Sequence, residues 1–218
     1  MSRRRNLPDT ASVAHLSDDG RMFAPSAARN AQDIATLVSS HAPQSGRALE
    51  LASGTGEHAV VFAREMPGLD WLPTDIDAAR RISIDSHARL ANLPNLRPAL
   101  PLDATTPGWA ETHGGQDLIV LVNLLHLISL TEAKTLIAEA AQALAAGGVV
   151  IIYGPFLRDG KTTSEGDAAF HGSLTAQDPE IGYKDDWDVI EWLQSNWLDL
   201  VQVVEMPANN MAFVARRP

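Results

Sequence analysis

The sequence predicts an α/β protein with a doubly wound, Rossmann-like fold of seven mostly parallel strands and an antiparallel C-terminal strand. Short apolar segments alternate with longer amphipathic segments along most of the chain, which is typical of βαβ units. The run DLIVLVN at 117–123 is almost continuously apolar, as expected of a central strand covered on both faces. A small-residue bend at 53–57 separates the first apolar segment from the next helical one.

The strands and helices follow from these apolar patterns and from turn residues. Strands are expected at 47–52, 70–73, 98–102, 117–123, 149–153, 200–205 and 211–215. Helices are expected at 26–41, 58–66, 77–92, 129–146 and 188–197. Ser129 and Glu132 have the spacing of a capping box, and Gly147-Gly148 is expected to end that helix. The turn at 207–210 joins the last two strands as a hairpin.

The chain is expected to form one domain at 23–218, preceded by a polar leader at 1–22. The stretch 155–187 is too long for a routine connection, and insertions of this length are lids, binding loops or disordered segments. Because it follows a strand end, where doubly wound sheets bind ligands, we expect it to cover a substrate site.

The composition of this 218-residue chain argues against several classes of partner, namely nucleic acids, metal ions and membranes. A net charge of −10 disfavours nucleic acid, and the basic run Arg3 to Arg5 is interpreted as a solvated tail. The chain has no cysteine, and its seven histidines show no metal-ligand spacing, so no metal site is expected. It also lacks an apolar run long enough to cross a membrane and an apolar signal segment, so we expect a cytoplasmic protein without membrane contact.

The bend is the first candidate binding element. In LELASGTGEHAV, Gly54 and Gly56 lie where a strand must turn sharply into a helix, and glycine lets a ligand approach the backbone. Gly54, Gly56 and Ala59 also satisfy the G-x-G-x-x-A pattern of dinucleotide enzymes, with Asp75 about twenty residues on. A NAD(P)-dependent oxidoreductase is therefore an alternative that the bend alone does not exclude.

Three acidic residues at successive strand ends add to this element. Glu50 lies inside the first strand, where a buried carboxylate needs a cation, such as the ammonium of S-adenosylmethionine, or the loop amides beneath the bend. Asp75 can accept hydrogen bonds from two ribose hydroxyls, or cap a turn. Asp103 can accept a hydrogen bond from an adenine amino group with Leu102 or Ala104 against the ring, or form an Asx turn.

These residues resemble class I methyltransferases, although Ala52 stands where the general pattern has glycine. A closer resemblance, over nearly the whole chain, is to the domain of unknown function 938 family, whose animal members are called methyltransferase-like protein 26. The segments that carry it are FAPSAARN (23–30), ELASGTGEHAVVFA (50–63), WLPTD (71–75), LDATTPGW (102–109), NLLHLIS (123–129), YGPF (153–156) and MPANN (206–210).

The resemblance implies S-adenosylmethionine as cofactor, S-adenosylhomocysteine as product, and a class I methyltransferase fold. The residues expected to bind the cofactor are Arg29, Glu50, Ala52, Gly54, Gly56, Asp75, Ile76, Asp103, Ala104 and Asn123. Arg29 would pair with the cofactor carboxylate, or be an ordinary exposed helix arginine. The segment 164–185 departs from the family pattern because it contains no arginine, so no substrate is carried over from relatives. A non-catalytic methyltransferase-like binding protein is a further alternative.

The candidates for chemistry follow the central strands. Asn123 could orient a methyl acceptor, and His126, with a pKa expected in the useful range, could take its proton, or His126 could be a hydrogen-bonded histidine packed beneath the site. Tyr153 is a third catalytic candidate. The expected acceptor pocket contains Phe156, Asn209 and Asn210, and core or turn roles are the alternatives for Tyr153 and both asparagines. We expect a small-molecule acceptor, neutral or cationic given the acidic chain.

Overall fold

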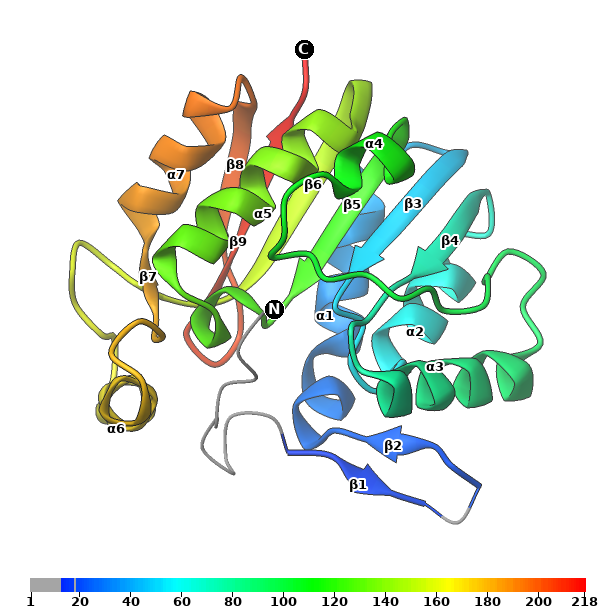
Figure 1. The fold of residues 1–218 in the computed structure, drawn as a ribbon, viewed down its shortest axis with the longest axis horizontal. Coiled ribbons are helices and arrows are strands. Elements are labelled where there is room, and N and C mark those ends of the chain that lie inside the picture. Colours follow the sequence, from blue (N-terminus) through cyan, green and yellow to red (C-terminus); the bar gives the residue numbers. More distant parts are fainter. Residues whose placement is uncertain (1–12, 18) are drawn as a thin grey trace.

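The central sheet has seven strands, six of them in the order β4-β3-β5-β6-β9-β8, with β7 paired to β6. The computed structural model describes residues 13–17 and 19–218, and helices cover both faces of the sheet (Figure 1). β3, β4, β5 and β6 are parallel, whereas β9 is antiparallel to both β6 and β8. The expected doubly wound, mostly parallel sheet with an antiparallel C-terminal strand is confirmed.

The strands of this sheet are β3 (Gly46–Leu51), β4 (Leu69–Pro73), β5 (Gln116–Val122), β6 (Leu144–Leu157), β7 (Lys184–Asp185), β8 (Asp199–Glu205) and β9 (Asn210–Arg216). A separate two-stranded sheet consists of β1 (His15–Leu16) and β2 (Met22–Phe23). The helices are α1 (Pro25–His41), α2 (Glu57–Glu65), α3 (Ala78–Ala91), α4 (Trp109–His113), α5 (Leu130–Ala143), α6 (Glu165–Gln177) and α7 (Asp186–Ser195). A short 3₁₀ turn, Leu125–Leu127, follows β5.

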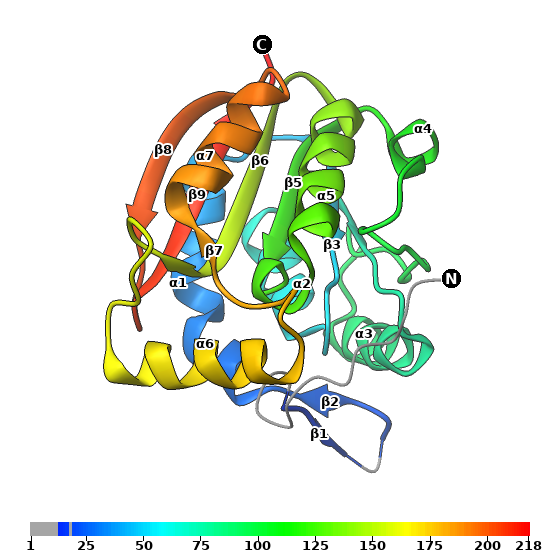
Figure 2. The same cartoon turned by 60° about the vertical axis from the view of Figure 1, so that its left-hand side comes forward.

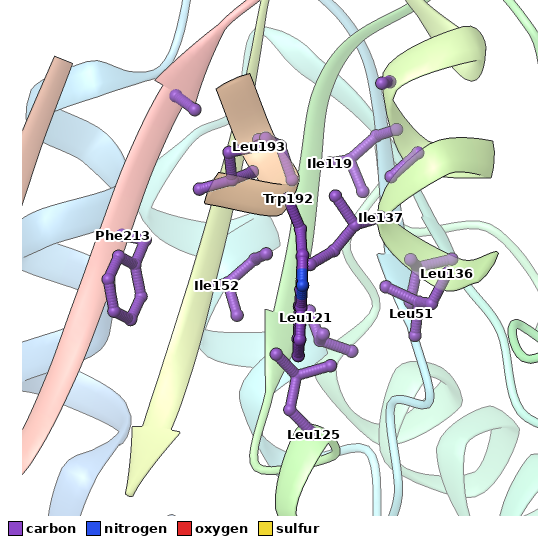
Figure 3. Close-up of a cluster of buried hydrophobic side chains, with 14 of the residues drawn as sticks. Leu51, Ile119, Leu121, Leu125, Leu136, Ile137, Ile152, Trp192, Leu193 and Phe213 are labelled. Carbon is purple, nitrogen blue, oxygen red and sulfur yellow. The ribbon is translucent and has the colours of Figure 1, made fainter. Parts of the chain in front are cut away.

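Alternation along the strands builds two cores. On β5, Ile119 and Leu121 belong to the core under α5 and α7, whereas Leu118 and Val120 belong to the core under α1 and α2. This is why DLIVLVN is apolar at every central position. In the first core, Trp192 and Leu193 of α7 lie over Ile119, Leu121 and Ile152 of the sheet (Figure 3).

Two predicted boundaries near β4 and β5 were wrong. No strand forms at 98–102, where the chain makes only an isolated bridge, Thr74 to Leu100. Pro98 and Pro101 lack the amide hydrogen that a strand ladder requires, which explains the interruption. The helix expected at 129–146 ends at Ala143, and β6 begins at Leu144. A register shift between β5 and β6 takes up Gly147 and Gly148, so these glycines end no helix.

The last helix also differs from the prediction. α7 covers Asp186–Ser195 instead of 188–197, because the Asp185 carboxylate accepts a hydrogen bond from Trp187 N and starts the helix two residues earlier. Trp197 lies beyond the helix with a φ of 60°, and it is 86% exposed instead of contributing to the apolar face. The capping box at Ser129 and Glu132 forms as expected.

The expected insertion and the expected leader contain more secondary structure than their sequences indicated. The stretch 155–187 contains the end of β6, all of α6 and β7, so it is an ordered insertion with a helix of its own. Most of the predicted leader at 1–22, including Arg3, Arg4 and Arg5, lies outside the described residues. Figure 2 shows α6 and the β1–β2 pair near the same edge of the sheet, where β3, β5 and β6 end.

Candidate functional site

A cavity of about 650 Å³ lies at the carboxyl ends of β3, β5 and β6. On one side it is lined by an inner wall, which we define as Glu50, 52–55, His58, 122–124 and Tyr153. On the other side is an outer wall, which we define as residues 13–14, 24–27, Asp167, Phe170 and Tyr183. Doubly wound sheets bind ligands at this edge, and the volume is typical of a small-molecule site.

The bend after β3 brings backbone to the surface of the cavity. Ala52, Gly54 and Gly56 all have left-handed φ values of 51°, 61° and 93°. Ala52 and Gly54 line the cavity, but Gly56 does not. A Cβ on Gly56 would lie 2.6 Å from the Cα of Ile84 in α3, so Gly56 is required for packing α2 against α3. The sequence predicted that Gly56 contacts a ligand, whereas in the structure it contacts α3.

Glu50 is a buried carboxylate at the floor of the cavity. It is 2% exposed, and burial raises its pKa to about 8 despite a 2.8 Å hydrogen bond from the Trp71 indole. No described basic residue forms a salt bridge with it. The alternative that Glu50 caps the amides beneath the bend does not occur, because the bond to Gly54 N comes from Asp75 instead.

Asp75 and Asp103 lie behind the cavity lining. Asp75 accepts hydrogen bonds from Gly54 N at 3.0 Å and Asp77 N at 2.9 Å, and burial raises its pKa. Asp103 accepts from both the amide and the hydroxyl of Thr105, at 3.0 and 2.6 Å, which is the Asx turn considered as an alternative. Both aspartates therefore make turn-stabilising bonds. Asp75 N also donates to Leu100 O, which places the 100–103 segment beside the bend.

The residues flanking these aspartates do not reach the cavity either. Ile76 is 61% exposed, and Ala104 is buried in the core under α5. Arg80 does line the cavity, and its Nη1 would lie 3.5 Å from a Cβ on Gly54. A cation therefore stands next to the bend at the position where the sequence predicted only acidic residues.

Asn123 and His126 both line the cavity. Asn123 has a φ of 57°, which asparagine tolerates, and its backbone N–H donates to the backbone carbonyl oxygen of Tyr153 at 2.8 Å. His126 is 5% exposed, and burial, together with the nearby Lys184 ammonium, lowers its pKa to about 3. The expectation that His126 titrates in the range of an efficient base was wrong for this structure. A neutral imidazole can still orient an acceptor by hydrogen bonding.

Tyr153 belongs to a polar group that the sequence did not predict. Asn30 Nδ2 donates to the Tyr153 hydroxyl at 3.5 Å, and Asn30 Oδ1 lies 2.9 Å from His58 Nε2. Burial raises the pKa of Tyr153 and lowers that of His58 to about 4. All three residues line the cavity.

The outer wall is organised around Asp167 of α6. Its carboxylate accepts four side-chain hydrogen bonds, from Thr163, Ser164, Tyr183 and Asn209. Burial alone would raise the pKa of Asp167, but these bonds outweigh it and lower the pKa. Phe170 and Tyr183 place their rings edge-on to His126, with centroids 5.8 and 6.1 Å from its ring. The far side of the cavity is therefore aromatic.

The predicted site residues divide into two groups. Those that line the cavity are Arg29, Glu50, Ala52, Gly54, Asn123, His126, Tyr153 and Asn210. Those that do not are Gly56, Asp75, Ile76, Asp103, Ala104, Phe156 and Asn209. Phe156 is 2% exposed and packs against Phe213 in the core, so it was wrongly assigned to the pocket. Asn209 contributes indirectly, through its bond to Asp167.

Several lining residues were missed, above all Asn30, His58, Asp167, Phe170 and Tyr183. Asn30 and His58 were within the quoted segments FAPSAARN and GEHAV, so their polar side chains on apolar helix faces were an available signal. The α6 residues gave no such signal. Among residues 13–17 and 19–218, no group of three or more potential metal ligands occurs, and none of the helices there is long and apolar enough to span a bilayer.

The sequence profile of the family described as "Protein of unknown function (DUF938)" matches residues 21–217. The chain belongs to this family. The match takes in the bend, the insertion at 155–187 and the hairpin of β8 and β9, so every wall of the cavity lies within the DUF938 region except residues 13–14.

Solved structures similar to this DUF938 chain are methyltransferases. They include an O-methyltransferase family protein from Burkholderia thailandensis (17% identity, TM-score 0.75), an O-methyltransferase family 2 protein from Planctomyces limnophilus in complex with apigenin (18%, 0.71), and human N-acetylserotonin methyltransferase in complex with SAM (16%, 0.70). Each match covers 88% of this chain but only 57%, 60% and 52% of the other. The likeness establishes the class I methyltransferase fold, and the chain spans little more than half of each neighbour.

Proposed function

We propose that this protein is an S-adenosylmethionine-dependent methyltransferase that acts on a small-molecule acceptor in the cavity at the carboxyl edge of the sheet. The observation that carries the proposal is Glu50, a buried carboxylate on the cavity floor with no ionic partner among the described residues. A buried carboxyl group in this position is well suited to a cationic ligand, which would stabilise its charged form. The fold supports the same cofactor, and so do two structural neighbours solved with SAM or with SAH.

Residues in and next to the inner wall fit such a cofactor. Glu50 can accept hydrogen bonds from its ammonium group, and Arg29, which is exposed at the cavity, can pair with its carboxylate. Ala52 and Gly54 leave space for close approach to the bend. Asp75 lies behind the cavity lining, but it has unused acceptor capacity after its two amide bonds, since a carboxylate has about four lone-pair sites.

The cofactor supplies a methyl group on a sulfonium, which any well-placed nucleophile can accept. The chain's own contribution is then to hold the acceptor and exclude water, since positioning alone gives large accelerations. Asn123 and neutral His126 would orient the acceptor by hydrogen bonds, and the rings of Phe170 and Tyr183 would shield it from solvent. The insertion at 155–187 would therefore cover the substrate site. His126 with a pKa of about 3 is a weak base, so the reaction would not depend on it for proton removal.

Calorimetric titration with S-adenosylmethionine and S-adenosylhomocysteine tests the proposal directly. We expect sub-millimolar binding of both, and the absence of binding by protein with a native circular dichroism spectrum would overturn it. Binding at neutral pH should also release a proton, because the Glu50 carboxyl group, with a pKa of about 8, must ionise to pair with the cofactor. Repeating the titration in buffers of different ionisation enthalpy measures that proton.

Residue variants locate the bound cofactor. Asp75→Ala should weaken binding by about 1–3 kcal/mol if the carboxylate holds the ribose. Asp70→Ala is the matched control, because Asp70 is an exposed partner of Arg97 outside this cavity, and it should leave affinity unchanged.

Fluorescence titration with NADH tests the oxidoreductase alternative, which requires an enhancement of NADH fluorescence on binding. Incubation with labelled cofactor and a metabolite extract distinguishes an enzyme, which yields a labelled small molecule, from a binding protein.

A further inference from the structure

His58 determines which groups donate and which accept in the hydrogen bonds that lead to Tyr153. His58 is 9% exposed in α2, and with a pKa of about 4 it is neutral at physiological pH. A neutral imidazole has one N–H donor. Because His58 Nε2 faces the carbonyl oxygen of Asn30 at 2.9 Å, Nε2 must carry that hydrogen.

The bond from His58 also fixes the orientation of the Asn30 side-chain amide. A primary amide has its acceptor oxygen and its donor nitrogen on opposite sides, so an oxygen held by His58 leaves the NH₂ group for Tyr153. Asn30 Nδ2 lies 3.5 Å from the Tyr153 hydroxyl, which is the acceptor in this pair. The hydroxyl hydrogen must then point elsewhere.

No described residue accepts that hydrogen, because the contact with Asn30 is the one hydrogen bond that the Tyr153 hydroxyl makes within the described chain. Tyr153, Asn30 and His58 all line the cavity, and the aromatic rings of Phe170 and Tyr183 line its other side. A buried hydroxyl without an acceptor is costly unless a ligand or water provides one. The Tyr153 hydroxyl is therefore a hydrogen-bond donor that a ligand in the cavity can use.

We infer that Asn30 and His58 are positioning residues that direct the Tyr153 hydroxyl as a hydrogen-bond donor to the methyl acceptor, which must present a lone pair there. The acceptor is accordingly a small molecule with a hydrogen-bond-accepting group at this wall, such as a phenol, carboxylate or carbonyl compound, and an ammonium is disfavoured because it offers no lone pair. This inference rests on the proposed function. Of the neutral or cationic acceptors suggested by the overall charge of −10, it keeps the neutral ones and disfavours a cation at this wall.

Nitrogen NMR of the histidine rings tests the first step without any ligand. We expect the His58 ring, assigned by its loss in His58→Gln, to be the Nε2–H tautomer and to remain neutral down to about pH 5. The Nδ1–H tautomer would reverse the amide of Asn30 and overturn the inference.

Ligand probes test the second step. With the protein saturated by S-adenosylhomocysteine, the affinities of benzamide, benzoate and benzylamine are measured by saturation-transfer NMR. We expect benzamide and benzoate to bind about 3- to 10-fold more tightly than benzylamine, which corresponds to one hydrogen bond. Equal or tighter binding of benzylamine would overturn the inference while leaving the proposed function intact. Failure of S-adenosylhomocysteine to bind would instead count against the proposed function.

Three variants distinguish the orientation of the Tyr153 hydroxyl from its mere presence. Tyr153→Phe removes the donor, and Asn30→Asp should remove it as well, because a carboxylate accepts the tyrosine hydrogen and turns it away from the cavity. Asn30→Leu leaves the hydroxyl free to rotate and should keep most of the preference. Neutral benzamide is the decisive probe, since Asn30→Asp also adds a charge. If Asn30→Asp bound benzamide as tightly as the wild type while Tyr153→Phe bound it more weakly, the positioning role would be wrong.

Discussion

The two walls of the cavity are held in different ways. The inner wall consists of strand ends and the bend, which are fixed by the two cores on either side of the sheet. The outer wall is attached by polar contacts and by one small apolar cluster. The segment before α1 is bound through Glu57, Ser83 and His87, whereas α6 is bound through Asp167 and through Leu174, which packs with Ile181 and Tyr183. Segments with few buried apolar contacts open most easily, so we expect ligands to enter by displacement of the outer wall.

Gly56→Ala should give the largest effect, because it acts on the packed inner side. The new Cβ would lie 2.6 Å from Ile84 Cα at a φ of 93°, and we expect a loss of roughly 2–4 kcal/mol in the free energy of unfolding. Gly108→Ala is the matched control, since it has a φ of 97° but no atom within 4 Å, and should cost about 1 kcal/mol. Urea unfolding measures both. Equal losses would mean that packing at the bend is unimportant.

Glu50→Gln tests the ionisation of the buried carboxyl group of the inner wall. Wild-type Glu50 keeps its proton up to about pH 8 when folded but releases it near 4.5 when unfolded, so stability falls as pH rises between these values. His58 and His126, with lowered pKa values of about 4 and 3, oppose this only below 6.5. We expect the wild-type free energy of unfolding to fall by roughly 2 kcal/mol from pH 6.5 to 8.

In Glu50→Gln that slope should be absent, because glutamine does not ionise but can still accept the hydrogen bond from Trp71. Chemical unfolding at several pH values without ligand provides the measurement. Asp70→Asn, which changes an exposed carboxylate, should keep the wild-type slope. A slope that persists in Glu50→Gln would assign the pH dependence to another group.

Tyr183→Phe tests how the outer wall is held. It removes the hydroxyl that donates to Asp167 at 3.2 Å, and we expect a loss of about 0.5–1.5 kcal/mol. Hydrogen exchange should accelerate in α6 while the amides of β5 and β6 are unchanged. Ser173→Ala removes a hydroxyl from the exposed side of the same helix, where it bonds only to Phe170 O, and should change exchange much less. Acceleration spread evenly over the sheet would contradict a separately opening outer wall.

Trp197→Gly lies outside both walls and should have the smallest effect. Trp197 is 86% exposed with a φ of 60°, so glycine relieves backbone strain at the cost of a more flexible unfolded chain. We expect the unfolding free energy to change by no more than about 0.5 kcal/mol. A large loss in thermal melting would show that the indole makes a contact absent from this structure.

The same division between walls explains what the sequence could predict. The parallel sheet and the bend were predictable, because apolar periodicity and small residues at a strand end are local signals of the inner wall. The strand predicted at 98–102 does not form, since its two prolines lack the amide hydrogens of a strand ladder in spite of its apolar character. α6 was predicted as a loop because it is amphipathic only weakly and buries one residue. Its position over the cavity depends on long-range bonds, such as Asn209 to Asp167, that no local pattern encodes.

The place of β9 has a consequence for biosynthesis. This strand, near the end of the chain, inserts between β6 and β8, and Asn210 at its start lines the same cavity as Val13. While a ribosome is still translating the preceding 200 or so residues, β6 has no antiparallel neighbour and the ligand cavity has an open side. The lining of the cavity is therefore complete, and a bound ligand can contribute its full stabilisation, only once the final hairpin has been synthesised.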